Sequence, residues 1–238
     1  MERASGLRLS SSGRKFTLLM LGLTVLLAIA PASQAAPLTG TTLTNPGDTI
    51  FASLIPSGTA AGSLLATMLS PYSFVTTAGT TSGTLRSAVF MNPSGTLDFY
   101  YQVDNSPNSA TAIARETDTS FVNFLTYTGY RIDGGSLAGG FVNGTQTPVT
   151  ADRNAAGTVV GFSFFPPDSG KVLPGTTSSV LVISTNATLY TAGNAAVIDG
   201  GTQTVAAFQP LSGVPEPTTM ALMGAGLVAL ACVRKRRK

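Results

Sequence analysis

Apolar and polar residues alternate over two neighbouring stretches of the chain, and this pattern restricts the fold more than any other. With the exception of Ser87, the odd-numbered positions of residues 85–91 and 97–103 are all apolar or aromatic. Successive side chains of a β-strand point to opposite faces, so a period of two predicts two strands. The turn-forming residues 92–95 (Asn-Pro-Ser-Gly) lie between them and predict a hairpin. In its second strand we expect the inward residues to be Leu97, Phe99, Tyr101 and Val103, and the outward residues to be Asp98, Tyr100 and Gln102.

Short stretches rich in aromatic and β-branched residues recur downstream. We expect further strands over residues 119–132, 141–150, 158–165, 180–185, 187–190 and 202–208. Residues 151–157 predict a second hairpin loop, and residues 60–69 are the one stretch that a short helix would also fit. Short strands separated by Gly, Pro and Asn, without alternating helices, predict an all-β fold: a single antiparallel β-sandwich or jelly-roll-like domain.

Candidate catalytic residues are scarce. The chain contains no His, and its single Cys is Cys232. These absences exclude Ser-His-Asp and Cys-His catalytic arrangements and the usual His or thiolate metal sites. Glycoside hydrolysis by two carboxylates stays open, because it needs only a pair of acids about 5 to 9.5 Å apart, and Asp98 and Asp104 are the candidates. Asp residues near strand ends are more typical of turns and caps. We therefore expect no enzyme and no cofactor.

A Ca²⁺ site is the one metal alternative. Asp98, Asp104, Asn105 and Asn108 would supply oxygen ligands of the kind that Ca²⁺ binds in loops. Their spacing matches no EF-hand loop, and Asx turns use the same residue types. We expect no metal site here, with Ca²⁺ as the alternative.

The N-terminal residues predict a secretory signal peptide. Cations at positions 3, 8, 14 and 15 precede a 15-residue apolar stretch, residues 16–30, and small residues follow it. We expect cleavage between Ala35 and Ala36, since Ser33 and Ala35 then occupy the minus-three and minus-one positions. The Arg14-Lys15 pair is not a twin-arginine motif, so the expected route is the Sec translocon.

The C-terminal residues predict a membrane helix. Residues 218–233 are uncharged, and five consecutive cations follow them: Arg234, Lys235, Arg236, Arg237 and Lys238. As a helix these 16 residues would be roughly 24 Å long, against a hydrocarbon core of about 30 Å. Bilayer thinning absorbs a shortfall of this size, and the basic cluster marks the cytoplasmic end. The alternative is a buried helix of a globular domain, which the preceding Pro215 and Pro217 disfavour.

The order of these C-terminal features resembles the PEP-CTERM sorting signal of Gram-negative bacteria. Its motif stands here as Val214, Pro215, Glu216 and Pro217, followed by the apolar segment and the basic cluster. The resemblance covers about a tenth of the chain and concerns sorting, since proteins with this tail have otherwise unrelated bodies. It implies an exosortase as the membrane processing partner. It also implies export across the inner membrane and at least transient anchoring, in organisms that make exopolysaccharide.

The residues between the two ends are mildly acidic. The whole chain has a formal net charge of +3, but residues 37–213 hold five basic and nine acidic residues. The positive charge thus belongs to the ends, which removes the electrostatic basis for binding nucleic acid. The expected organisation is a signal peptide (1–35), a flexible junction (36–45), a β-sandwich domain (46–209), a tether with the Pro-Glu-Pro motif (210–217), a transmembrane helix (218–233) and a cytoplasmic basic cluster (234–238).

Together these features predict an exported, non-catalytic protein of the cell surface or extracellular matrix that is associated with exopolysaccharide. A module that binds a glycan or another surface protein through loops of the sandwich is the first alternative. A hydrolase that uses carboxylates is the second.

Overall fold

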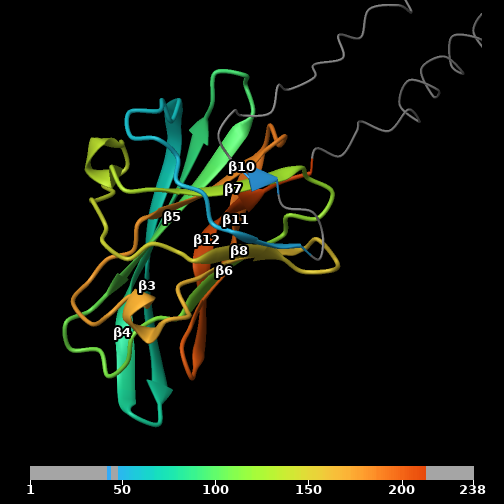
Figure 1. Ribbon diagram of the computed structural model, residues 1–238. Helices are drawn as coiled ribbons and strands as arrows, with labels where there is room; N and C mark the ends of the chain where they lie inside the picture. Colours follow the sequence, from blue (N-terminus) through green and yellow to red (C-terminus); the bar gives the residue numbers. More distant parts are fainter. Residues whose placement is uncertain (1–41, 44–47, 213–238) are drawn as a thin grey trace, which may run out of the picture. The chain divides into compact units, whose positions relative to one another are not determined.

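The computed structural model describes residues 42–43 and 48–212, which belong to the compact unit Ala35–Lys238 (Figure 1). Apart from two 3₁₀ turns, the regular structure of this part is all strand. No helix in the described part has the length and apolar character needed to cross a membrane. The expected signal peptide and transmembrane helix lie outside the described residues. The strands are β1 (Thr42–Leu43), β2 (Thr49–Phe51), β3 (Ser63–Thr76), β4 (Gly79–Met91), β5 (Leu97–Asn105), β6 (Arg115–Thr119), β7 (Thr126–Arg131), β8 (Thr150–Arg153), β9 (Val159–Ser163), β10 (Val180–Thr185), β11 (Tyr190–Ile198) and β12 (Thr202–Pro210), with the 3₁₀ turns at Gly134–Ser136 and Asp168–Gly170.

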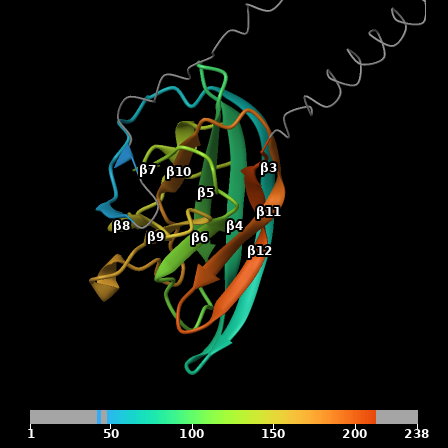
Figure 2. The same cartoon turned by 90° about the vertical axis from the view of Figure 1, so that its right-hand side faces the viewer.

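The strands form two six-stranded sheets. The first sheet has the order β1-β7-β10-β5-β4-β3, and the second has the order β12-β11-β6-β9-β8-β2. Every ladder between these strands is antiparallel. The prediction of an all-β, antiparallel fold is therefore confirmed. In Figure 2, β11 and β12 run beside β3 and β4, and Ser70 Oγ on β3 donates to Ala206 O on β12 at 2.6 Å.

The main core lies between the inner faces of the two sheets. β4 and β5 form the expected hairpin, in register from the pair Met91 and Leu97 to the pair Gly83 and Asn105. The inward residues of β5 are the four expected from the alternation, and all are fully buried: Leu97, Phe99, Tyr101 and Val103. The second sheet contributes Val160 and Phe162 of β9, Ala195 and Val197 of β11, and Val205 and Ala207 of β12.

The outer face of the first sheet carries a second, smaller core. Two irregular segments, residues 52–62 and 132–149, cover this face and are called here the covering segments. Ile55 from the first and Phe141 from the second pack on outward side chains of the sheet: Ala88, Phe90, Tyr100, Val180 and Val182. A Cβ atom at Gly129 on β7 would lie 2.9 Å from Ile55 Cγ1, so a glycine permits this close approach. Asp98, Tyr100 and Gln102 do point outward as expected, but all three are buried. The covering segments contact Tyr100 and Gln102, and Asn92 of the β4–β5 turn donates to Asp98.

Several expected boundaries are wrong. Residues 63–69 belong to β3 and not to a helix, because the edge strand pairs with β4 along its whole length. Residues 120–125 form a turn between β6 and β7, with positive φ at Ser120 and Asn123. Residues 141–149 are irregular, and the second hairpin loop is shorter than expected because β8 extends to Arg153. Residues 187–189 precede β11.

Candidate functional site

A depression of about 190 Å³ opens to solvent on the outer face of the first sheet. Its floor comes from β4 and β5, where the register places Arg86 opposite Gln102 and Thr84 opposite Asp104. Its rim comes from the covering segment 132–149 and from Thr177. The lining residues are Thr84, Arg86, Gln102, Asp104, Gly140, Val142 and Thr177.

The guanidinium of Arg86 is held against a turn of two glycines. Arg86 Nη1 donates to Gly139 O at 3.0 Å. A Cβ atom at Gly140 would lie 3.0 Å from this same nitrogen, and the φ of Gly140 is +79°. L side chains rarely adopt that conformation, so residue 140 suits glycine on both counts. The single hydrogen bond fixes the guanidinium and leaves most of its donors for solvent or a ligand.

The acidic side of the depression is held in a similar way. Thr177 Oγ1 donates to Asp104 Oδ1 at 2.7 Å. The side-chain amide of Gln102 joins the rim of the depression to its floor. Gln102 Nε2 donates to Val142 O at 2.8 Å, and Val142 N donates to Gln102 Oε1 at 3.0 Å. The depression thus presents a positioned cation, a positioned anion and two threonine hydroxyls. This set can recognise a small polar ligand that offers both donors and acceptors.

Asp98 lies on the same outer face but is closed off from solvent. Asn92 Nδ2 donates to Asp98 Oδ1 at 3.0 Å and to Thr96 Oγ1 at 2.8 Å, all within the β4–β5 turn region. Burial raises the pKa of Asp98 to about 7, and the hydrogen bond from Asn92 opposes that rise. Asp98 therefore serves the turn and has no access to a substrate in this conformation.

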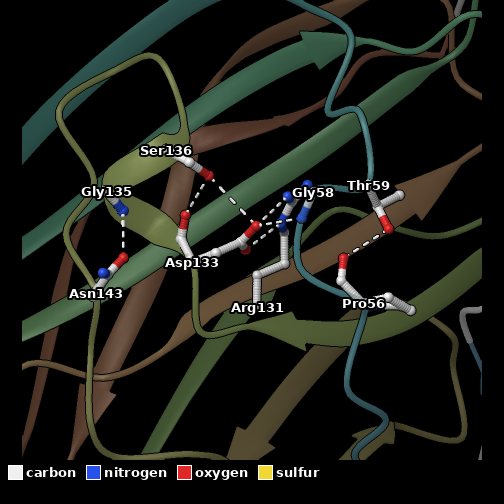
Figure 3. A network of polar contacts seen from close by, with 8 residues as sticks. All are labelled: Pro56, Gly58, Thr59, Arg131, Asp133, Gly135, Ser136 and Asn143. Carbon is white, nitrogen blue, oxygen red and sulfur yellow. Dashed lines mark hydrogen bonds and ion pairs between the residues drawn. The ribbon is translucent and has the colours of Figure 1, made fainter.

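An ion pair joins the end of β7 to both covering segments (Figure 3). Arg131 donates to both carboxylate oxygens of Asp133, from Nε at 3.0 Å and from Nη2 at 2.9 Å. Gly58 N donates to Asp133 Oδ2 at 2.8 Å, and Ser136 Oγ donates to Asp133 O at 2.7 Å. The hydrogen bonds from Arg131 lower the pKa of Asp133 to about 2. This network fastens the cover to the sheet.

Two acidic residues lie side by side in the main core. Glu116 and Asp118 on β6 are 0 and 1 % exposed. Their carboxyl groups have no hydrogen-bond partner among the described residues outside the pair, and the two lie close enough to hydrogen-bond to each other. Neither acid is a candidate site residue from the sequence alone. Charged residues at alternate positions of a strand ordinarily mark its solvent face, so no local signal would have placed them inside.

The other residues singled out from the sequence do not form one site. Asp98 and Asp104 are six positions apart on β5, which separates them by roughly 20 Å along the strand. Asn105 Nδ2 instead donates to Thr111 O and Val172 O. Within the described part of the chain there is no group of three or more Asp, Glu, His or Cys residues able to hold a metal ion. The cleavage residues Ala35 and Ala36, the sorting motif at 214–217 and the basic cluster at 234–238 lie outside the described residues.

Comparison with protein families places the C-terminal tail. Residues 213–237 match the PEP-CTERM protein-sorting motif, as the resemblance had implied. This motif implies export, processing by an exosortase in the membrane, and membrane-anchored transit toward the cell surface. No curated protein and no solved structure matches the chain.

Proposed function

We propose that this chain is an exported, non-catalytic protein of the cell surface or extracellular matrix of a Gram-negative bacterium, where it is associated with exopolysaccharide. The observation that carries the proposal is the match of residues 213–237 to the sorting motif. The mildly acidic β-domain agrees with a structural or interaction role, because buried polar side chains such as Asn92 and Gln102 hold a turn and a covering segment in place. In this proposal the Sec translocon exports the chain after recognising the signal peptide at residues 1–35.

Fractionation of cells tests the sorting step. A variant that ends at Ser212 and a second variant with Pro215→Ala, Glu216→Gln and Pro217→Ala are compared with the full chain in the native host. We expect the wild type to pass through the membrane fraction and the truncated variant to be missing from it. The motif variant should reach the membrane and remain unprocessed, as the mass of its C-terminus would reveal. Wild-type fractionation and processing in both variants would contradict the proposal.

A second candidate function is a module that binds a glycan or a surface protein, and the depression around Arg86 favours it. A positioned guanidinium, a positioned carboxylate and two hydroxyls match the hydroxyl-rich surface of a saccharide better than an apolar ligand. The side chain of Val142 at the rim is about half exposed and offers a small apolar contact to a sugar ring.

A glycan array with the full chain tests this second candidate. Arg86→Gln and Asp104→Asn each remove one charge from the depression, and Asp168→Asn is the matched control because its carboxylate is 81 % exposed in an ion pair outside it. We expect binding that both depression variants lose and the control retains. Equal signals from all four proteins, or none on any glycan, would remove the depression as a glycan site.

A further inference from the structure

Glu116 and Asp118 are neighbours on one face of one strand. They are two positions apart on β6, so both side chains point to the same side of the second sheet. That side is the inner one, since the alternating residues Arg115, Thr117 and Thr119 are half-buried on the other face while both acids are buried. Two carboxyl groups are thus held side by side between the sheets.

The surroundings of the pair are apolar. The register places Phe162 of β9 and Val197 of β11 opposite Glu116, and Val160 and Ala195 opposite Asp118. All four neighbours are fully buried in the main core. Tyr101 of β5, on the opposite sheet, is a titratable side chain that interacts electrostatically with both acids. Its phenol donates to Phe208 O at 2.7 Å. Tyr101 stays neutral, because burial raises its pKa well above the ordinary value.

The nearest cation is engaged elsewhere. Arg115 precedes Glu116 on β6, but its guanidinium lies over Gly161 on the outer face of the second sheet. There it donates to both oxygens of Asp152 and to Ser163 Oγ. Arg115 therefore has its own carboxylate partner, and no cation of the described residues forms an ion pair with Glu116 or Asp118.

Two ionised carboxylates are not stable in such a place. An ionised carboxylate loses its hydration when it is buried, and a second one beside it adds like-charge repulsion. Both effects favour the protonated forms. Burial is the main cause that raises the pKa of each acid, and the charge of Glu116 raises that of Asp118 further. The hydrogen bond with Asp118 and the charge of Arg115 lower the pKa of Glu116, but burial outweighs them. A protonated carboxyl can also donate a hydrogen bond to its neighbour, which an ionised pair cannot do.

We propose that the Glu116–Asp118 pair is a proton-binding site built into the core, so that the domain takes up protons when it folds at neutral pH and is weakened when alkali removes them. The unfolded chain releases these protons, because its Glu and Asp titrate near their ordinary pKa values of about 4.3 and 3.9. The folded state keeps them to higher pH. The stabilisation is fully present below the unfolded pKa values and is lost as the pH rises toward and through the folded ones.

The sequence offers a direct measurement of this protonation. Glu116 is the only Glu between Glu2 and Glu216, so carboxyl-¹³C labelling of glutamate gives three signals in the full chain in detergent micelles. The variants Glu2→Gln and Glu216→Gln assign the other two. We expect Glu116 to keep the chemical shift of a protonated carboxyl at neutral pH and to titrate at least two pH units above the others. A signal that titrates with them would overturn the proposal.

Unfolding as a function of pH gives the second test. The melting temperature of the full chain should fall by several degrees between about pH 5 and pH 9. In the neutral variant with Glu116→Gln and Asp118→Asn, most of this fall should disappear. Asp98→Asn is the control, because the buried carboxyl of Asp98 also lowers the melting temperature as the pH rises. The difference between this variant and the wild type gives the part of the fall that is due to Asp98, and that part is subtracted. A fall that is equally steep in the neutral variant would contradict the proposal.

A bound cation is the competing explanation, and the same samples distinguish it. If a cation neutralised the pair, Glu116 would show the shift of an ionised carboxylate at neutral pH. A chelator would then lower the melting temperature, and that result would overturn proton binding. An unchanged melting temperature in chelator, together with the protonated signal, supports it.

Discussion

Two acidic sites of the domain, Asp133 on the outer face of the first sheet and the Glu116–Asp118 pair in the main core, have pKa shifts of opposite sign. On the outer face of the first sheet, Asp133 receives two hydrogen bonds from Arg131 and one from Gly58. In the main core, Glu116 and Asp118 receive none from outside the pair among the described residues. The pKa of Asp133 falls to about 2, whereas burial raises the pKa of each core acid. Partners, and not burial alone, decide whether a carboxyl in this fold is charged.

The difference also sets opposite responses to pH. Asp133 has a lowered pKa, so its contribution to stability is present above its unfolded pKa of about 3.9 and is lost as the pH falls toward 2. The core acids have raised pKa values, so their contribution is lost as the pH rises. The contributions of Asp133 and of the Glu116–Asp118 pair to stability therefore respond to pH in opposite directions.

The largest expected effect comes from breaking the ion pair of the cover. Arg131→Met leaves Asp133 without its cation in a mostly buried place, and we expect the free energy of unfolding to fall by about 3 to 5 kcal/mol. Urea denaturation of the full chain measures it. A loss no larger than that of Arg115→Met would show that the deeper burial of the Arg131–Asp133 pair does not increase its contribution to stability.

Asp98 is a buried carboxyl whose hydrogen-bond partner, Asn92, carries no charge. Its pKa of about 7 lies above the unfolded value, so its contribution is complete below about pH 4 and is lost as the pH rises to 7. We expect Asp98→Asn to be more stable than the wild type at pH 8 by roughly 2 to 4 kcal/mol, with little difference at pH 4. Denaturation curves at the two pH values measure the change, and an advantage of the same size at both would argue against titration of Asp98.

Arg115→Met removes the same type of side chain from a more exposed pair. The side chains of Arg115 and Asp152 are 27 and 25 % exposed, so water can solvate the carboxylate that is left. We expect a loss of about 1 kcal/mol, in the range of exposed ion pairs. A loss equal to that of Arg131→Met would mean that exposure does not separate the two pairs.

The smallest effect is expected at Asp168, because its ion pair with Lys171 is the most exposed of those among the described residues. Lys171 keeps a second partner, Asp199, at 3.2 Å. Asp168→Asn should change the free energy of unfolding by less than about 0.5 kcal/mol. A larger loss, measured by the same denaturation, would show that Lys171 depends on Asp168 more than the geometry indicates.

The sequence was informative where one local rule governs the structure. Alternation placed the inward residues of β5 correctly, and the turn residues 92–95 located the hairpin. The same alternation put Asp98 and Tyr100 outward, but it carried no information about the covering segments, which bury that face through irregular backbone. A short helix also fits residues 60–69 because local propensity is ambiguous there, and pairing with β4 decides the conformation of residues 63–69.

The buried acids were the least predictable feature. The only Glu of the exported domain reads as a surface residue in the pattern Arg115-Glu116-Thr117-Asp118. Its inward orientation depends on the register of β6 with β9 and β11, which are distant in sequence. The depression was missed for a similar reason, because Arg86 and Thr177 meet only through the fold.

The side-chain amide of Gln102 binds both the N–H and the C=O of Val142. These are the two backbone groups that a neighbouring strand would otherwise bind. The covering segment 132–149 is thus held at a few points and does not share the registers that define the sheets. Its length and sequence can change between these points without moving β5 or β10. The domain therefore combines a frame set by strand register with a cover that is fastened at separate points, so the surface can be altered between these points while the frame stays in place.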